Sequence, residues 1–170
     1  GGLTNLGDTL QDCLQMGVAV YVDETSLGEH AVTLNNIIAG VQIVPGSTIA
    51  ELIAQAKAEP GKMSYASSGP GTPYHMAGEL FKSMAGVDIL HVPYKGSAGA
   101  RTDVLGGQVQ MMFDAVTVMS QHAREGKVKA LGTSGTARSS VLPGVPTIAE
   151  AGVPGYETTI WLGVMAPKGT

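Results

Sequence analysis

Residues 62–85, KMSYASSGPGTPYHMAGELFKSMA, contain a strand, a glycine-rich turn and a helix in one uninterrupted run. Lys62–Ala66 alternates between polar and apolar side chains, which predicts a strand. Thr72 followed by Pro73 is a typical helix start, because threonine often caps a helix and proline fits its first turn. We expect this helix to end at Gly86. Its predicted buried face consists of Met76, Leu80, Phe81 and Met84.

The alternation of strand and helix continues along the chain. The apolar segments Val87–Val92, Val109–Phe113 and Val128–Thr133 predict three more strands. Helical patterns at Ser97–Leu105 and Val116–Arg124 separate them. Strands joined by helices of about ten residues form right-handed crossovers and run parallel to one another. We therefore expect an α/β fold with a Rossmann-like parallel sheet.

Two capping boxes, Thr48–Glu51 and Thr147–Glu150, lie outside this alternation. In a capping box, the first and fourth residues bond each other's backbone N–H groups and so start a helix. We expect one helix to run from Thr48 until Pro60-Gly61 stops it, and a second, short helix to end at Gly152. Further strands are expected at Gly17–Val22, Asn35–Gly40 and Tyr156–Met165.

The composition excludes several classes of protein. A chain of 170 residues suffices for one domain with a core. Its ten Lys and Arg residues form no cluster and the net charge is −4, so we expect no nucleic-acid partner. No apolar run reaches the roughly 18 to 20 residues of a membrane span, and we recognise no signal peptide. Cys13 alone can form neither an intramolecular disulfide nor a cysteine-based zinc site. We also expect no cofactor.

The richest candidate site is the loop Ser67–Thr72, SSGPGT, between an expected strand and an expected helix. Ligands of open parallel sheets bind at the carboxyl ends of the strands, and the N-terminus of a helix favours an anion there. Tyr74 stands where a dinucleotide-binding fingerprint requires glycine, and Lys95-Gly96-Ser97 has the wrong order for a phosphate loop. A carboxylate is therefore favoured over a phosphate. The alternative is a tight turn without a ligand.

Three neighbouring side chains have a ligand-binding and an ordinary interpretation. His75 either donates into the pocket or is a core or surface histidine. Lys95 is either a counter-ion of the ligand or a solvated cation. Asp114 either accepts a ligand amine or, as we favour, caps the helix that follows it. Gly132–Thr136 lacks the last glycine of a nucleophile elbow, and the sequence predicts neither a catalytic constellation nor a metal site.

The chain strongly resembles the Bug-type receptors, the extracytoplasmic substrate-binding proteins of tripartite tricarboxylate transporters. Two long runs carry the resemblance: SYASSGPGTPYHMAGELFKSMAGVDILHVPYKGSAGARTDVLGGQVQMMFDAV at residues 64–116, and GKVKALGTSGTARSSVLPGVPTIAEAGVPGYE at residues 126–157. HVPYKG, LGGQV and VPTIAEAG followed by PGYE are specific to that family. The segments IAELIAQAKAEPGKM and TIWLGVMAPKGT also fit, so the resemblance covers about residues 47–170.

The resemblance implies a type II periplasmic binding protein of two lobes that is not an enzyme. It implies capture of small carboxylates, such as dicarboxylates, tricarboxylates or aromatic acids, and their delivery to membrane subunits of the transporter. A periplasmic location follows from the same resemblance. It also implies these substrate-binding residues: Ser67, Ser68, Gly71, Thr72 and His75 in the loop, with Tyr94, Lys95 and Asp114 as pocket wall.

The resemblance divides the chain unevenly. Residues 61–136 match the second, substrate-binding lobe, residues 47–60 and 137–170 match parts of the first lobe, and residues 1–46 stay unassigned. Because a clamshell binds by closing two half-sites, we expect this chain alone to bind carboxylates weakly or not at all. We also expect its uncovered apolar surface to promote self-association. The rival functions are a small-acid-sensing effector lobe and, third, an acyl-transfer hydrolase that uses Ser67.

Overall fold

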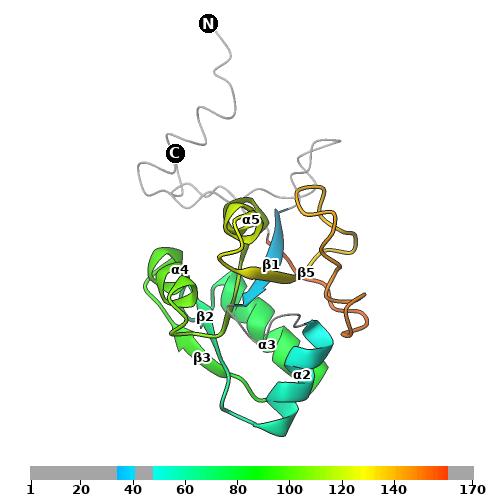
Figure 1. Cartoon of the computed structure of the whole chain (residues 1–170). Helices are drawn as coiled ribbons and strands as arrows, with labels where there is room; N and C mark the ends of the chain where they lie inside the picture. The colour runs from blue at the N-terminus through cyan, green and yellow to red at the C-terminus, as the bar shows by residue number, and fades with distance from the viewer. Residues whose placement is uncertain (1–33, 41–47, 161–170) are drawn as a thin grey trace, which may run out of the picture. The chain divides into compact units, whose positions relative to one another are not determined.

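The computed structural model describes residues 34–40 and 48–160. Residues 34–159 form one compact unit, in which helices cover both faces of a sheet (Figure 1). The helices are α2 (Ile49–Ala58), α3 (Pro73–Ala85), α4 (Ser97–Leu105) and α5 (Val116–Arg124). The strands are β1 (Leu34–Gly40), β2 (Ser64–Ser67), β3 (Leu90–Pro93), β4 (Met111–Ala115), β5 (Lys129–Thr133) and β6 (Thr159–Ile160).

The sheet contains the predicted parallel strands, and one antiparallel strand is added to them. Its strand order is β3-β2-β4-β1-β5, and β6 pairs with β1. β2 runs parallel to β3 and to β4, as predicted. β1, however, lies between β4 and β5 and is antiparallel to both. The α/β fold is confirmed, but local pattern does not reveal that an early strand separates two later ones.

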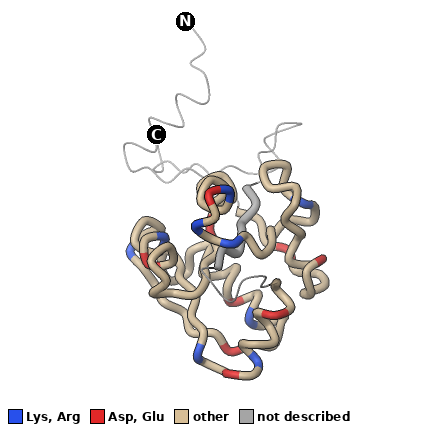
Figure 2. Tube along the Cα trace, viewed as in Figure 1, with Lys and Arg blue, Asp and Glu red and all other residues tan. Residues whose placement is uncertain are grey.

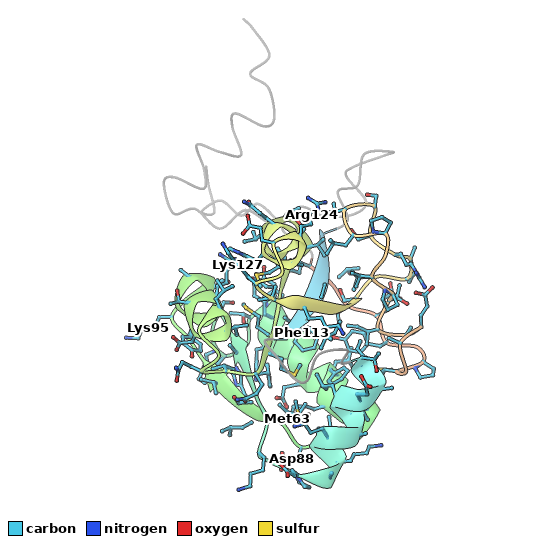
Figure 3. All side chains as sticks on the ribbon, viewed as in Figure 1. Met63, Asp88, Lys95, Phe113, Arg124 and Lys127 are labelled. Atoms are coloured by element: carbon cyan, nitrogen blue, oxygen red, sulfur yellow. The ribbon has the colours of Figure 1, made fainter. Side chains whose placement is uncertain are left out.

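The two helix layers follow from the alternation of side chains along the strands. Tyr65, Met111 and Phe113 face one layer and pack with residues of α2 and α3, while Ala66 and Met112 face the other and pack with α4 and α5. Figure 3 shows Phe113 in the interior of the unit. Both faces of β2 and β4 are therefore buried, as is typical of parallel strands.

Helix boundaries were predicted better than strand boundaries. α4 and α5 begin and end at the predicted residues, and Gly86 ends α3 in the left-handed conformation, with φ +62°. β3 begins three residues later than predicted, because Val87 and Ile89 are buried in the core before the strand pairs. An apolar run marks burial, and burial extends beyond the paired part of the strand.

The predicted buried face of α3 is partly wrong. Met76 is 57% exposed and Met84 is 41% exposed, whereas Phe81 is fully buried. The buried positions also include Ala77 and Gly78. The small residues Ala77 and Gly78 let the helix approach the sheet closely, so the buried stripe is rotated toward them.

The two capping boxes differ in outcome. Thr48 and Glu51 bond each other's backbone N–H groups and start α2, as predicted. Thr147 and Glu150 make the same reciprocal bonds, but the segment after them is a turn and not a helix. Of the predicted strand 156–165, the described residues contain β6; Gly17–Val22, Cys13 and Trp161 lie outside them.

Charged residues lie scattered along the described chain, with basic and acidic residues interspersed (Figure 2). Within residues 34–40 and 48–160, no helix is both long and apolar enough to cross a membrane.

Candidate functional site at the carboxyl edge of the sheet

The carboxyl ends of β2 and β4 lie side by side, since the two strands are parallel neighbours. The loop Ser67–Thr72 follows β2 and leads directly into α3. The loop after β3 joins the same edge: Tyr94 N–H donates to the carbonyl of Ser67 at 3.0 Å, and Gly96 N–H donates to the carbonyl of Ser68 at 3.1 Å. The edge is therefore formed by backbone from two loops.

The N-terminus of α3 has no side-chain cap. Thr72 occupies the N-cap position, as predicted, but its hydroxyl donates to the carbonyl of Gly69 at 2.7 Å. Pro73 follows it and has no N–H. The N–H groups of the first helical turn, those of Tyr74 and His75, are the ones that normally lack an intrahelical partner. This end of α3 thus retains the donors and the partial positive charge that favour an anion.

The side chain of Ser67 stabilises the loop from the buried end of β2. It is fully buried, and its hydroxyl shares a 2.6 Å hydrogen bond with Nε2 of His91. The same hydroxyl accepts the N–H of Gly69 at 3.2 Å. His91 of β3 is thus a structural histidine whose Nε2 is bonded to the loop.

The side chain of His75 in α3 packs against this loop. Its Nδ1 accepts the N–H of Gly71 at 3.0 Å, and its ring stacks on His91 with centroids 4.1 Å apart. His91 also stacks on Tyr65 of β2, at 4.9 Å. Burial, and then the charge of His75, hold the pKa of His91 below its usual value. The site histidines form one stack with Tyr65 beneath the loop.

Asp114 is completely buried at the end of β4. The guanidinium of Arg101 in α4 donates to both of its carboxylate oxygens, with Nη2 3.2 Å from Oδ1. Oδ1 also accepts the N–H of Ala115 at 2.8 Å. The favoured capping role is wrong, because α5 begins after Ala115 with no side-chain cap. Burial, and then the nearby carboxylate of Asp114, raise the pKa of Tyr74 to about 12.

Tyr94 and Lys95 differ in their surroundings. The hydroxyl of Tyr94 donates to Asp103 at 2.6 Å, and that hydrogen bond is the main cause of a pKa raised to about 12. Lys95 is exposed and extends away from the sheet (Figure 3). The structure therefore places Tyr94 against α4 and gives Lys95 the surroundings of a solvated cation.

Sequence reasoning selected the loop as the candidate site but did not anticipate Arg101 and Tyr74 beside it. Arg101 is 13 residues from Asp114 in the sequence and follows no motif. An ion pair between a helix and a distant strand end leaves no local pattern. Tyr74 was noted only because a glycine was absent at that position.

The side chains at this edge of the sheet suit the binding of a ligand better than metal coordination or nucleophilic catalysis. Among residues 34–40 and 48–160, no group of three His, Cys, Asp or Glu side chains lies together as a metal site would require. Ser67 and His91 lie at the distance of a nucleophile and its base, but the serine is fully buried, which excludes direct attack on a solvent-borne ester in this conformation.

Comparison with known proteins identifies the family. Residues 32–170 match the family model described as "Tripartite tricarboxylate transporter family receptor". The chain belongs to that receptor family. The family is one of receptors and not of enzymes, as the sequence analysis expected.

Several members of this receptor family are similar to the chain. Protein BugT of Bordetella pertussis is 42% identical over 119 residues, which cover 70% of this chain and 36% of that protein. An R. palustris protein solved with adipate is 35% identical, with a TM-score of 0.76, over 90% of this chain and 48% of that one. MatC from Rhodopseudomonas palustris with bound malate is 30% identical, with a TM-score of 0.75, over 81% and 47%. The chain thus spans about half, or less, of the length of these family members.

Proposed function

We propose that this chain binds a small carboxylate at the Ser67–Thr72 loop, as part of the receptor of a tripartite tricarboxylate transporter. The uncapped N-terminus of α3 carries the proposal, because it presents donors at the edge of the sheet where ligands of such folds bind. The solved relatives described with adipate and with malate support a carboxylate over a phosphate.

The residues have different roles in this proposal. Ser68, Gly71 and Thr72 border the ligand together with the first-turn N–H groups of α3. Ser67 and His91 hold the loop from below. Tyr94 and Asp114 complete the proposed pocket wall: the Tyr94 N–H fixes the carbonyl of Ser67, and Asp114 acts through Arg101. Lys95, which is exposed, contributes only its positive charge near this edge.

The remaining expectations concern the whole receptor. Delivery to membrane subunits of the transporter and a periplasmic location belong to this proposal, supported by family membership. Residues 61–136 form the substrate-binding lobe in it, and residues 47–60 and 137–170 belong to the first lobe. Self-association stays a prediction. The large apolar side chains that are exposed among the described residues, and that it would cover, are Met76, Met84, Leu90 and Val118.

A substitution at Thr72 tests the site. Thr72→Val removes the hydroxyl that fixes the carbonyl of Gly69, and we expect carboxylate affinity to fall about fivefold, the equivalent of one hydrogen bond of ~1 kcal/mol. Calorimetry with adipate and malate measures the affinity.

Thr72→Ser is the matched variant, since it retains the hydroxyl, and it should bind like the unaltered chain. Thr102→Val in α4 controls for the loss of a threonine hydroxyl elsewhere. Equal affinity of Thr72→Val and the unaltered chain would place the carboxylate somewhere else.

A further inference from the structure

His75 turns back from the first turn of α3 onto the loop that precedes the helix. Its Nδ1 accepts the N–H of Gly71 at 3.0 Å. Gly71 has φ +74°, a left-handed conformation that other residues rarely adopt. The histidine therefore fixes the orientation of the residue immediately before the N-cap.

The ring of His75 is itself held in place. It stacks on His91 of β3 at 4.1 Å, with 25° between the ring planes. Nε2 of His91 shares the 2.6 Å hydrogen bond with Ser67. Ser67 and Gly71 lie near opposite ends of the loop. Each is hydrogen-bonded to one of the two stacked imidazoles: Ser67 to His91, and Gly71 to His75.

The bond to Gly71 requires an unprotonated Nδ1. An imidazole nitrogen accepts a hydrogen bond only when it carries no proton, and an imidazolium carries a proton on both nitrogens. Protonation of His75 would place two donors against each other and leave the Gly71 N–H without its acceptor. The bond therefore selects the neutral tautomer with the proton on Nε2.

If Nδ1 of His75 became protonated, it would need a hydrogen-bond acceptor, and the acidic group near it is already engaged. Glu79 in α3 accepts the hydroxyl of Tyr65 at 2.8 Å and the ammonium of Lys82 at 2.9 Å. Burial opposes the ionisation of Glu79, but the hydrogen bonds from Lys82 and Tyr65 hold its pKa below the usual value. On the other side, burial lowers the pKa of the stacked His91, and a positive charge on His75 would lower it further. The neighbours from α3, β2 and β3 thus include no acidic group that is not already engaged.

We propose that His75 is a positioning residue that keeps the Ser67–Thr72 loop in its carboxylate-binding conformation only while its imidazole is neutral. The proposal rests on the proposed function of the loop. It makes binding dependent on pH. Acidification that protonates His75 decreases the competent fraction of the protein, so carboxylate affinity should fall by up to about tenfold for each further pH unit.

The test has a matched pair of variants. His75→Asn places an amide oxygen near the position of Nδ1, so it retains an acceptor for Gly71 and cannot be protonated between pH 5 and 8. His91→Gln retains a polar atom near Nε2 for Ser67 and removes the titration of that ring. NMR of the ligand-free chain between pH 8 and pH 5 follows the amide of Gly71 and the two imidazoles.

We expect the Gly71 amide shift to follow the titration of His75 in the unaltered chain and in His91→Gln, and to stay constant in His75→Asn. A Gly71 amide that ignores the titration of His75 would overturn the proposal, as would one that still titrates in His75→Asn.

Calorimetry with adipate and malate over the same pH range supplies the second measurement. Affinity should fall more steeply on acidification in the unaltered chain than in His75→Asn, where only the protonation of the acids themselves lowers it. Affinity that rises on acidification and is lost in His75→Asn would overturn the proposal and make His75 a direct donor to the ligand. Failure of both acids to bind at any pH contradicts the proposed function alone, because the ligand-free titration of Gly71 decides the role of His75.

Discussion

Asp114 carries its charge at a position with no exposed surface, and Arg101 is the cation that balances it. Removing one partner of a buried ion pair is costly because the remaining charge stays buried and uncompensated. We expect Arg101→Met to lower the free energy of unfolding by about 3 to 5 kcal/mol, as measured by urea denaturation. The variant should also disturb Tyr74, and through it the start of α3.

Arg138→Met is the control for this prediction. Arg138 pairs with Glu150 at 3.0 Å, but both side chains are 49% exposed. Exposed pairs contribute about 0 to 1 kcal/mol, so this variant should be nearly as stable as the unaltered chain. Equal losses in Arg101→Met and Arg138→Met would show that Asp114 does not depend on its partner.

For single residues, the sequence predicted local structure better than it predicted long-range hydrogen-bond partners. Thr72 as N-cap follows from a local rule and is confirmed. The hydrogen bond of Ser67 to His91, and that of Asp114 to Arg101, join residues 24 and 13 positions apart. Such partners depend on strand order and helix placement, which no local pattern contains.

The helix α3 is the element on which the site depends, and Gly78 sets its distance from the sheet. A Cβ at this position would lie 2.3 Å from Cε2 of Tyr65, whose ring is buried and bonded to Glu79. We expect Gly78→Ala to destabilise the chain by about 1 to 3 kcal/mol, although alanine improves helix propensity by about 1 kcal/mol. Thermal or urea unfolding measures the change.

Ser83→Ala in the same helix is the matched control, because Ser83 is exposed and its replacement adds no atom to the core. That variant should be as stable as the unaltered chain or slightly more stable. A Gly78→Ala variant that gains stability like Ser83→Ala would mean that α3 does not pack tightly against Tyr65.

At the scale of elements, helices with glycine or capping signals at their ends were predicted closely. The terminators of α3, α4 and α5 are local, so the sequence contains them. The position of β1 between β4 and β5 depends on pairing between strands that lie far apart in the sequence, which no local pattern contains. The turn after Thr147 shows the converse case, in which the local capping bonds form without a helix.

For the whole molecule, the relevant feature is the shared edge of β2 and β4. Parallel pairing of β2 and β4 brings three features to the carboxyl edge of the sheet: the uncapped end of α3, the stacked histidines and the Asp114–Arg101 pair. In the proposed function, the first-turn N–H groups of α3 are the neutral donors that this edge offers to a carboxylate.

The most direct measurement of the central claim is an NMR titration of the 170-residue chain with adipate at pH 8, which detects even weak binding. We predict that the backbone amides of residues 68–75 shift most, that those of Tyr94 and Gly96 shift less, and that those of α2 stay unchanged. The absence of shifts at millimolar adipate, or shifts centred on α2, would contradict a carboxylate site at the N-terminus of α3.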